Sequence, residues 1–170
     1  MRIRTVKFNF IMNAILTVSS ILFPLITFPY ISRVLLVEGS GKVAFATSVV
    51  SYFTMFATLG IPTYGIRECA RVRDNKEELS RMVQELLIIS GITTAITYGV
   101  FFLLLFVVPQ FRGQKELLIV IGASIGLTTI GVQWFYSALE QYSYITVCAV
   151  LFKIIGLILM FLLVKKPEDY

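Results

Sequence analysis

The sequence predicts an all-α fold, a polytopic transmembrane bundle of about five membrane-spanning helices. Of the 170 residues, 57% are hydrophobic and only 15% are charged, with a mean hydropathy of +0.84, whereas soluble domains contain roughly 25% charged residues. Residues 8–32, 43–66, 86–111 and 117–139 contain no Asp, Glu, Lys or Arg. About 20 apolar residues cross a bilayer as a helix, and these runs lack the period-two alternation of membrane β-strands.

The apolar runs predict where each span begins and ends. We place the spans at residues 8–31, 43–66, 86–108, 117–139 and 142–164, each 23 or 24 residues long. That length crosses a ~30 Å hydrocarbon core with some tilt. We expect one bundle over residues 1–170, with 67–85 forming a charged, solvated start to the third span. There Asp74 is the predicted helix cap, with Glu77 completing a capping box.

The first span is more polar than a simple membrane anchor. It contains Asn9 and Asn13, and Pro24 and Pro29 interrupt it. Proline removes a backbone hydrogen bond and kinks a helix, so the two prolines predict either a static kink or a helix that bends during gating. Arg33 follows at the end of the span and is either an interfacial anchor or a charge at the rim of a cavity.

Lys153 is the most informative single residue. It is the twelfth residue of the predicted fifth span, and a Lys at the centre of a membrane helix costs about 2.5–3.5 kcal/mol on insertion scales. From mid-span its ammonium is about 15 Å from the interface, too far for snorkelling. We therefore predict an inward-facing, hydrated cation that attracts an anionic group such as a phosphate or pairs with a carboxylate.

Other motifs indicate packing or surface contacts. Gly122 and Gly126, four residues apart, predict close helix approach. Gln133 and Trp134 belong to an aromatic cluster, which is either an interfacial belt or a surface that contacts sugar rings. The sequence contains no His, and Cys69 and Cys148 match no metal or redox spacing. We therefore expect no catalytic or metal site, no enzymatic activity, no cofactor and no nucleic-acid partner.

The distribution of Lys and Arg predicts the orientation. The N-terminal tail and the 67–85 segment carry eight, against six on the opposite side. Because positive residues accumulate on the cytoplasmic side, we expect a cytoplasmic N-terminus. Arg67 lies in the basic segment, which either forms a solvated surface or attracts phosphate-bearing groups.

Several stretches resemble a known family. Phe23-Pro24-Leu25-Ile26-Thr27-Phe28-Pro29-Tyr30-Ile31-Ser32-Arg33 and Gly60-Ile61-Pro62-Thr63-Tyr64-Gly65-Ile66-Arg67-Glu68 resemble signatures of Wzx-type polysaccharide repeat-unit (O-antigen or capsule) flippases. These belong to the superfamily of multidrug, oligosaccharidyl-lipid and polysaccharide exporters. Leu36 departs from the pattern, because the family usually has Gly there. Members have about twelve to fourteen helices in two bundles, so the resemblance implies that this chain is the N-terminal half-bundle of a MATE-like transporter and a fragment of a longer protein.

The resemblance implies a function. It implies alternating-access transfer of undecaprenyl-diphosphate-linked oligosaccharide across a bacterial or archaeal cytoplasmic membrane, for O-antigen, capsule or related polysaccharide synthesis. Coupling to H⁺ or Na⁺, and partners in the polysaccharide polymerase and chain-length machinery, follow from the same resemblance. Candidate diphosphate contacts are Lys153, Arg33 and Arg67. Candidate sugar contacts are Asn9, Asn13, Gln133 and Trp134.

Two other functions are compatible with the sequence. A MATE-type multidrug or cation antiporter should carry acidic residues inside its spans, and the predicted spans contain none. A non-transporting membrane scaffold subunit should tolerate substitution of Lys153 and of the two prolines.

Overall fold

The computed structural model describes residues 6–166, and this part of the chain is α-helical without strands. Five segments are long and apolar enough to cross a membrane: Lys7–Val34, Leu36–Arg71, Lys76–Val107, Lys115–Ala138 and Tyr142–Leu163. This confirms both the all-α transmembrane class and the predicted number of spans. The helices are α1 (Val6–Val34), α2 (Leu36–Thr58), α3 (Ile61–Arg71), α4 (Lys76–Val107), α5 (Pro109–Arg112), α6 (Lys115–Ile130), α7 (Gln133–Ala138) and α8 (Tyr142–Leu163).

The charged segment 67–85 does not all belong to the third span, contrary to the prediction: its first five residues end α3, and only its residues from 76 onward begin α4. The cap of α4 also differs from the prediction. Helix α4 begins at Lys76, and the Asn75 side chain accepts hydrogen bonds from the backbone N–H groups of Glu77 at 3.1 Å and Glu78 at 3.4 Å. The prediction that Asp74 caps this helix was therefore wrong by one residue. Asn and Asp cap equally well, so the backbone register decides between them.

Two of the predicted spans are each divided into two helices. The second breaks between α2 and α3, where Leu59 and Gly60 both have positive φ, 41° and 72°. Pro62 follows in the first turn of α3, where the absence of its N–H costs nothing. The fourth breaks at Gly131 and Val132, between α6 and α7. By contrast, α1 continues as one helix through Pro24 and Pro29.

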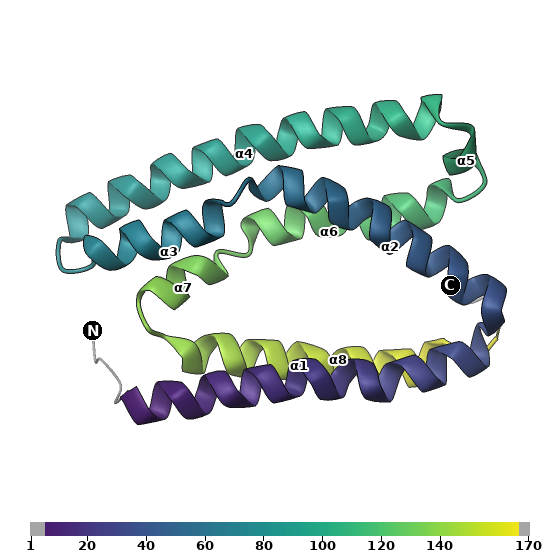
Figure 1. Cartoon of the computed structure of the whole chain (residues 1–170), viewed down its shortest axis with the longest axis horizontal. Coiled ribbons are helices and arrows are strands. Elements are labelled where there is room, and N and C mark those ends of the chain that lie inside the picture. The colour runs from purple at the N-terminus through teal and green to yellow at the C-terminus, as the bar shows by residue number, and fades with distance from the viewer. Residues whose placement is uncertain (1–5, 167–170) are drawn as a thin grey trace. The chain divides into compact units, whose positions relative to one another are not determined.

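The chain divides into two compact units, residues 1–41 with 140–170 and residues 42–139. Within the first unit, α1 and α8 lie side by side (Figure 1). The Thr146 hydroxyl donates to the Met12 carbonyl at 2.9 Å. At the other end of the helix pair, the Tyr30 hydroxyl donates to the Val164 carbonyl at 2.8 Å. These bonds tie α1 to α8 at two distant levels.

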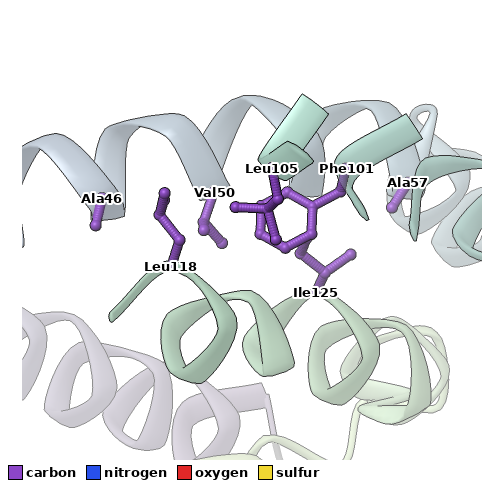
Figure 2. Packing of buried hydrophobic residues seen from close by; sticks show 7 residues of the cluster. All are labelled: Ala46, Val50, Ala57, Phe101, Leu105, Leu118 and Ile125. Carbon is purple, nitrogen blue, oxygen red and sulfur yellow. The ribbon is translucent and has the colours of Figure 1, made fainter. Parts of the chain in front are cut away.

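The second unit is built around α2, α4 and α6. Figure 2 shows a cluster of buried apolar side chains contributed by these three helices. Its members are Ala46, Val50, Ala57, Phe101, Leu105, Leu118 and Ile125. The Phe101 ring meets Phe53 edge to face, with centroids 5.1 Å apart. Because this cluster holds α2, α4 and α6 together, it positions the breaks at the ends of α2 and α6.

Close approach of α4 and α6 depends on two glycines, as their spacing predicts. A Cβ added to Gly122 would lie 2.8 Å from the Phe101 ring, and one added to Gly126 would lie 3.0 Å from the Tyr98 oxygen. The Tyr98 hydroxyl donates to the Gly122 carbonyl at 3.0 Å and accepts from the Gly126 N–H at 2.9 Å. It thus bonds the acceptor and donor of one turn of α6. The close contact of Gly122 and Gly126 with α4 confirms the packing prediction.

Candidate functional site

Lys153 lies in the middle of α8 and bonds to two serines of α1. It is the twelfth of the 22 residues of the helix. Its ammonium donates to the Ser19 hydroxyl at 3.0 Å and to the Ser20 hydroxyl at 2.8 Å. The side chain is partly buried. The ammonium therefore stays at mid-span between two helices, held by neutral hydroxyl groups.

The two serines are oriented as acceptors. Each hydroxyl donates its single hydrogen to the Leu16 carbonyl, at 2.8 Å in both cases. A hydroxyl has one hydrogen and two lone pairs, so the lone pairs of Ser19 and Ser20 remain for the Lys153 ammonium. Pro24 has no N–H and therefore cannot donate to the Ser20 carbonyl, four residues before it. This arrangement concentrates hydrogen-bond acceptors on α1 opposite the cation.

The other predicted contacts of the first unit do not gather around Lys153. Arg33 is exposed in the last turn of α1, and it lies thirteen positions after Ser20, about 20 Å along the helix axis. Asn9 is buried, and its Oδ1 atom has no hydrogen-bond partner among the described residues. Asn13 is exposed. Among the described residues, Lys153 is the candidate of this unit whose side chain forms hydrogen bonds between the two helices.

Arg67 belongs to the second unit and interacts locally. Its guanidinium lies 3.6 Å from the Glu68 carboxylate, which is also 3.8 Å from the guanidinium of Arg71. Arg67 and Arg71 are largely exposed, at 84% and 79% of their side-chain areas. Exposed ion pairs contribute little to stability, so this group is a solvated charged surface at the end of α3.

Gln133 and Trp134 line a pocket of about 290 Å³ within the second unit. The pocket lies where both helix breaks meet, since it is bounded by the end of α2, the start of α3, α4, the end of α6 and α7. None of the lining residues is charged. They are Ala57, Thr58, Ile61, Pro62, Ile66, Ser90, Thr128, Thr129, Gly131, Gln133, Trp134 and Ser137.

Trp134 is fixed by its contact with α3. A Cβ added to Gly65 would lie 2.6 Å from Trp134 Cε3, so only glycine allows the indole to lie this close to the helix. Trp134 is 7% exposed, and α3 packs against α7 here (Figure 1). A belt residue at the membrane surface would be more exposed. The structure therefore places this aromatic side chain in the interior of the second unit.

Some residues of these sites were not among the predicted contacts. Ser19, Ser20, Ser90 and Thr128 carry no motif by themselves. The signal for Ser19 and Ser20 is a pair of hydroxyls in an apolar span, and that for the pocket is Gly60 before Pro62. Neither signal indicates which helix lies opposite.

The comparisons with known proteins identify the family. A family model described as "Polysaccharide biosynthesis protein" matches residues 6–170. The chain belongs to this family. The match covers nearly the whole sequence, and it confirms the resemblance drawn from the motifs of the first two spans.

Two curated relatives carry the same description, "Putative O-antigen transporter". The protein from Shigella dysenteriae is 26% identical over 165 residues, covering 96% of this chain and 41% of the relative. The protein from Escherichia coli (strain K12) is 22% identical over 161 residues, covering 95% of this chain and 39% of the relative. The chain thus spans about two fifths of the length of these relatives, which are named as transporters rather than enzymes. No solved structure matches the chain significantly.

Proposed function

We propose that this protein takes part in moving undecaprenyl-diphosphate-linked oligosaccharide across the cytoplasmic membrane for the synthesis of O-antigen, capsule or a related polysaccharide. The observation that carries the proposal is the Lys153 ammonium, held at the middle of a membrane helix by two neutral hydroxyls. Membership of the polysaccharide biosynthesis family and the names of the two relatives support the class of substrate.

A diphosphate suits this cation better than its present partners do. Hydrogen bonds between an ammonium and a phosphate are charge-assisted and about twice as strong as neutral ones. The serine hydroxyls form hydrogen bonds with Lys153 but do not neutralise its charge. An anion that reaches the site is therefore attracted by a positive charge that no other group balances. Ionisable groups inside a membrane typically mark substrate or ion pathways. Lys153 is thus the proposed diphosphate contact, and Ser19 and Ser20 hold it when no substrate is bound.

The mechanism in this proposal is alternating access, with α1 as the moving element. Pro24 lies one turn beyond Ser20, and because proline has no N–H, the Ser20 carbonyl has no helical donor. A substrate that draws Lys153 away from the serines would loosen α1 from α8 at this point, where the helix bends most easily. Pro29, five residues further on, removes a second helical hydrogen bond in the same way. Coupling to H⁺ or Na⁺, and transfer of the lipid-linked product to a polymerase and chain-length machinery, complete the proposed process.

Binding to the chain in lipid nanodiscs tests the proposal directly. Undecaprenyl-diphosphate-linked oligosaccharide should bind more tightly than undecaprenol, which lacks the diphosphate. Lys153→Ala should reduce the ratio of these two affinities by about 10- to 100-fold, since hydrogen bonds to charged groups contribute about 1.5–3 kcal/mol. Lys153→Arg should retain most of it. Lys115→Ala, which removes a cation beside the Phe106 ring, is the matched control.

Transport in cells supplies the second measurement. Lys153→Ala and Lys153→Glu, introduced into the gene, should each reduce the polysaccharide at the cell surface while the protein is expressed normally. Normal surface polysaccharide in both variants, together with unchanged diphosphate binding by Lys153→Ala, would contradict the proposal.

A further inference from the structure

We infer that the pocket between the two helix breaks of the second unit binds one uncharged pyranose ring. This inference rests on the proposed function, because it assigns the sugar part of the substrate to a site distinct from the Lys153 contact. The pocket lies entirely within residues 57–137. Its size, its aromatic wall, its free hydrogen-bonding groups and its lack of charge each support a sugar as the occupant.

The size of the pocket suits a single ring. Its volume is about 290 Å³, close to the lower limit of the roughly 300–1,000 Å³ typical of small-molecule sites. Apolar side chains of α2 and α3, among them Ile61 and Pro62, form part of its wall. A small, mostly apolar cavity with a few polar groups is the usual form of a specific small-molecule site.

Trp134 contributes a rigid aromatic group to the pocket wall, with 7% of its area exposed. The contact with Gly65 fixes the indole, so no side-chain freedom is lost when a ligand packs against it. One side of a pyranose ring presents C–H groups, which pack on the face of an aromatic ring, whereas its hydroxyls need hydrogen-bond partners at the edge. Other residues that line the pocket, among them Ser90 and Gln133, provide such partners.

The Ser90 side chain is buried, only 6% exposed, and lines the pocket from α4. Its hydroxyl forms no hydrogen bond within residues 6–166. Only its backbone carbonyl is bonded to a side chain there, accepting from the Thr93 hydroxyl. The Ser90 hydroxyl is not among the buried polar atoms that lack a partner, so it is accessible from the pocket. A ligand hydroxyl placed at Ser90 can bond to it, and the Gln133 amide, which also lines the pocket, adds two donors and an acceptor.

The unwound turn between α6 and α7 frees two backbone acceptors, at residues that line the pocket. In a continuous helix, the N–H groups of Val132 and Gln133 would donate to the carbonyls of Thr128 and Thr129. Here they donate to Ile130 at 2.9 Å and Gly131 at 2.6 Å instead. The Thr128 and Thr129 carbonyls thus lose their helical donors, and both residues line the pocket. Non-helical backbone at membrane depth occurs where it lines a cavity, and sugar hydroxyls are suitable donors for these carbonyls.

The absence of charge decides against an ionic occupant. A phosphate or a carboxylate sugar would need a cation, and a metal ion would need carboxylates, whereas the lining residues include neither. A purely apolar occupant, such as part of a polyprenyl chain, would leave the Ser90 hydroxyl and the two carbonyls unsatisfied. A neutral sugar satisfies these groups and also uses the apolar wall.

Trp134 allows a direct test, because it is the single tryptophan of the sequence. The 170-residue chain is placed in nanodiscs, and its tryptophan emission is followed during titration. The ligands are galactose, N-acetylglucosamine, rhamnose and a lipid-linked oligosaccharide whose sugars are uncharged. Glycerol and glucuronate are the controls for polyol effects and for charge. We expect a saturable change of emission with at least one neutral sugar, free or lipid-linked, and none with glycerol or glucuronate.

Matched variants assign the response to the pocket. Gln133→Ala and Ser90→Ala should each raise the half-saturating sugar concentration, by about tenfold for a lost hydrogen-bond partner. Gln110→Ala and Ser80→Ala alter exposed residues outside the pocket and should leave it unchanged. Circular dichroism of each variant checks that the helices are intact.

The outcomes separate this inference from the proposed function. If no neutral sugar changes the emission saturably, or if Gln133→Ala and Ser90→Ala respond as the unaltered chain does, the sugar site is refuted. Diphosphate binding that still depends on Lys153 would then leave the proposed function standing. A sugar response that persists while Lys153→Ala has no effect on diphosphate binding would support the pocket and contradict the role of Lys153.

Discussion

The Lys153 ammonium lies 2.8 Å from the Ser20 hydroxyl, although the two residues are 133 positions apart along the chain. Ser19 accepts a second hydrogen bond, at 3.0 Å, and both serines donate to the Leu16 carbonyl. The contact links the first and last spans of the sequence at mid-helix. The serines have other partners if the lysine is removed, whereas the lysine has fewer if the serines are removed.

This asymmetry predicts unequal effects of substitution on stability. Replacing both serines, Ser19→Ala with Ser20→Ala, should lower the free energy of unfolding by about 1–3 kcal/mol, because it leaves a semi-buried charge without its acceptors. Lys153→Met should cost less, because the serines keep their bonds to Leu16. Unfolding in mixed micelles, followed by circular dichroism, measures both.

A matched control for the serine pair exists on α2. Ser48 and Ser51 are exposed and bond only to carbonyls of their own helix, so changing both to Ala should have little effect. Combining Lys153→Met with the two serine substitutions should recover most of the lost stability. A larger loss from Lys153→Met than from the serine pair would show that the contact does not work in this way.

Gly65→Ala should disrupt the packing of α3 against α7. The added Cβ would lie 2.6 Å from Trp134 Cε3, so the indole must move, at a typical cost of about 1–3 kcal/mol for overpacking. The tryptophan emission should shift toward that of a more exposed indole. Gly99→Ala is the control, since its Cβ would meet no atom within 4 Å and alanine favours helix by about 1 kcal/mol. Equal stability of the two variants would contradict the predicted crowding.

Leu36→Gly should leave the protein equally stable or stabilise it. Leu36 has a φ of 57°, and a left-handed conformation costs an L-residue with a Cβ roughly 1–2 kcal/mol. Glycine removes this strain but adds roughly 0.5–1 kcal/mol of chain entropy to the cost of folding, so the net gain is at most about 1 kcal/mol. Chemical unfolding compares it with Leu35→Gly, which removes a buried side chain, 5% exposed, and should destabilise. A clear loss of stability from Leu36→Gly would indicate that the leucine side chain itself stabilises the connection between α1 and α2.

Reporter fusions test the predicted orientation. A fluorescent protein that folds in the cytoplasm should be active when fused after Arg73, because the eight basic residues of this side are expected inside. Alkaline phosphatase, which is active outside, should be active when fused after Gly113. Phosphatase activity after Arg73 without activity after Gly113 would reverse the assigned orientation.

Much of the fold could be predicted because hydropathy is a local property. The five spans follow from charge-free runs of sufficient length, and the mid-span position of Lys153 needs only counting along one helix. The breaks in the second and fourth spans were missed, since Gly60 before Pro62 and the lone Gly131 do not interrupt the hydropathy. The cap of α4 was missed by one residue because Asp74 and Asn75 are chemically equivalent as caps.

By itself, the sequence determined the all-α membrane class, the number of spans, the family resemblance and the presence of a cation inside the last span. Only the tertiary structure decided what these residues contact. The partners of Lys153 are in α1, and the pocket joins residues of five helices from Ala57 to Ser137. Such contacts depend on which helix faces are opposed, and in a membrane nearly every face is apolar, so hydropathy alone cannot identify the buried one.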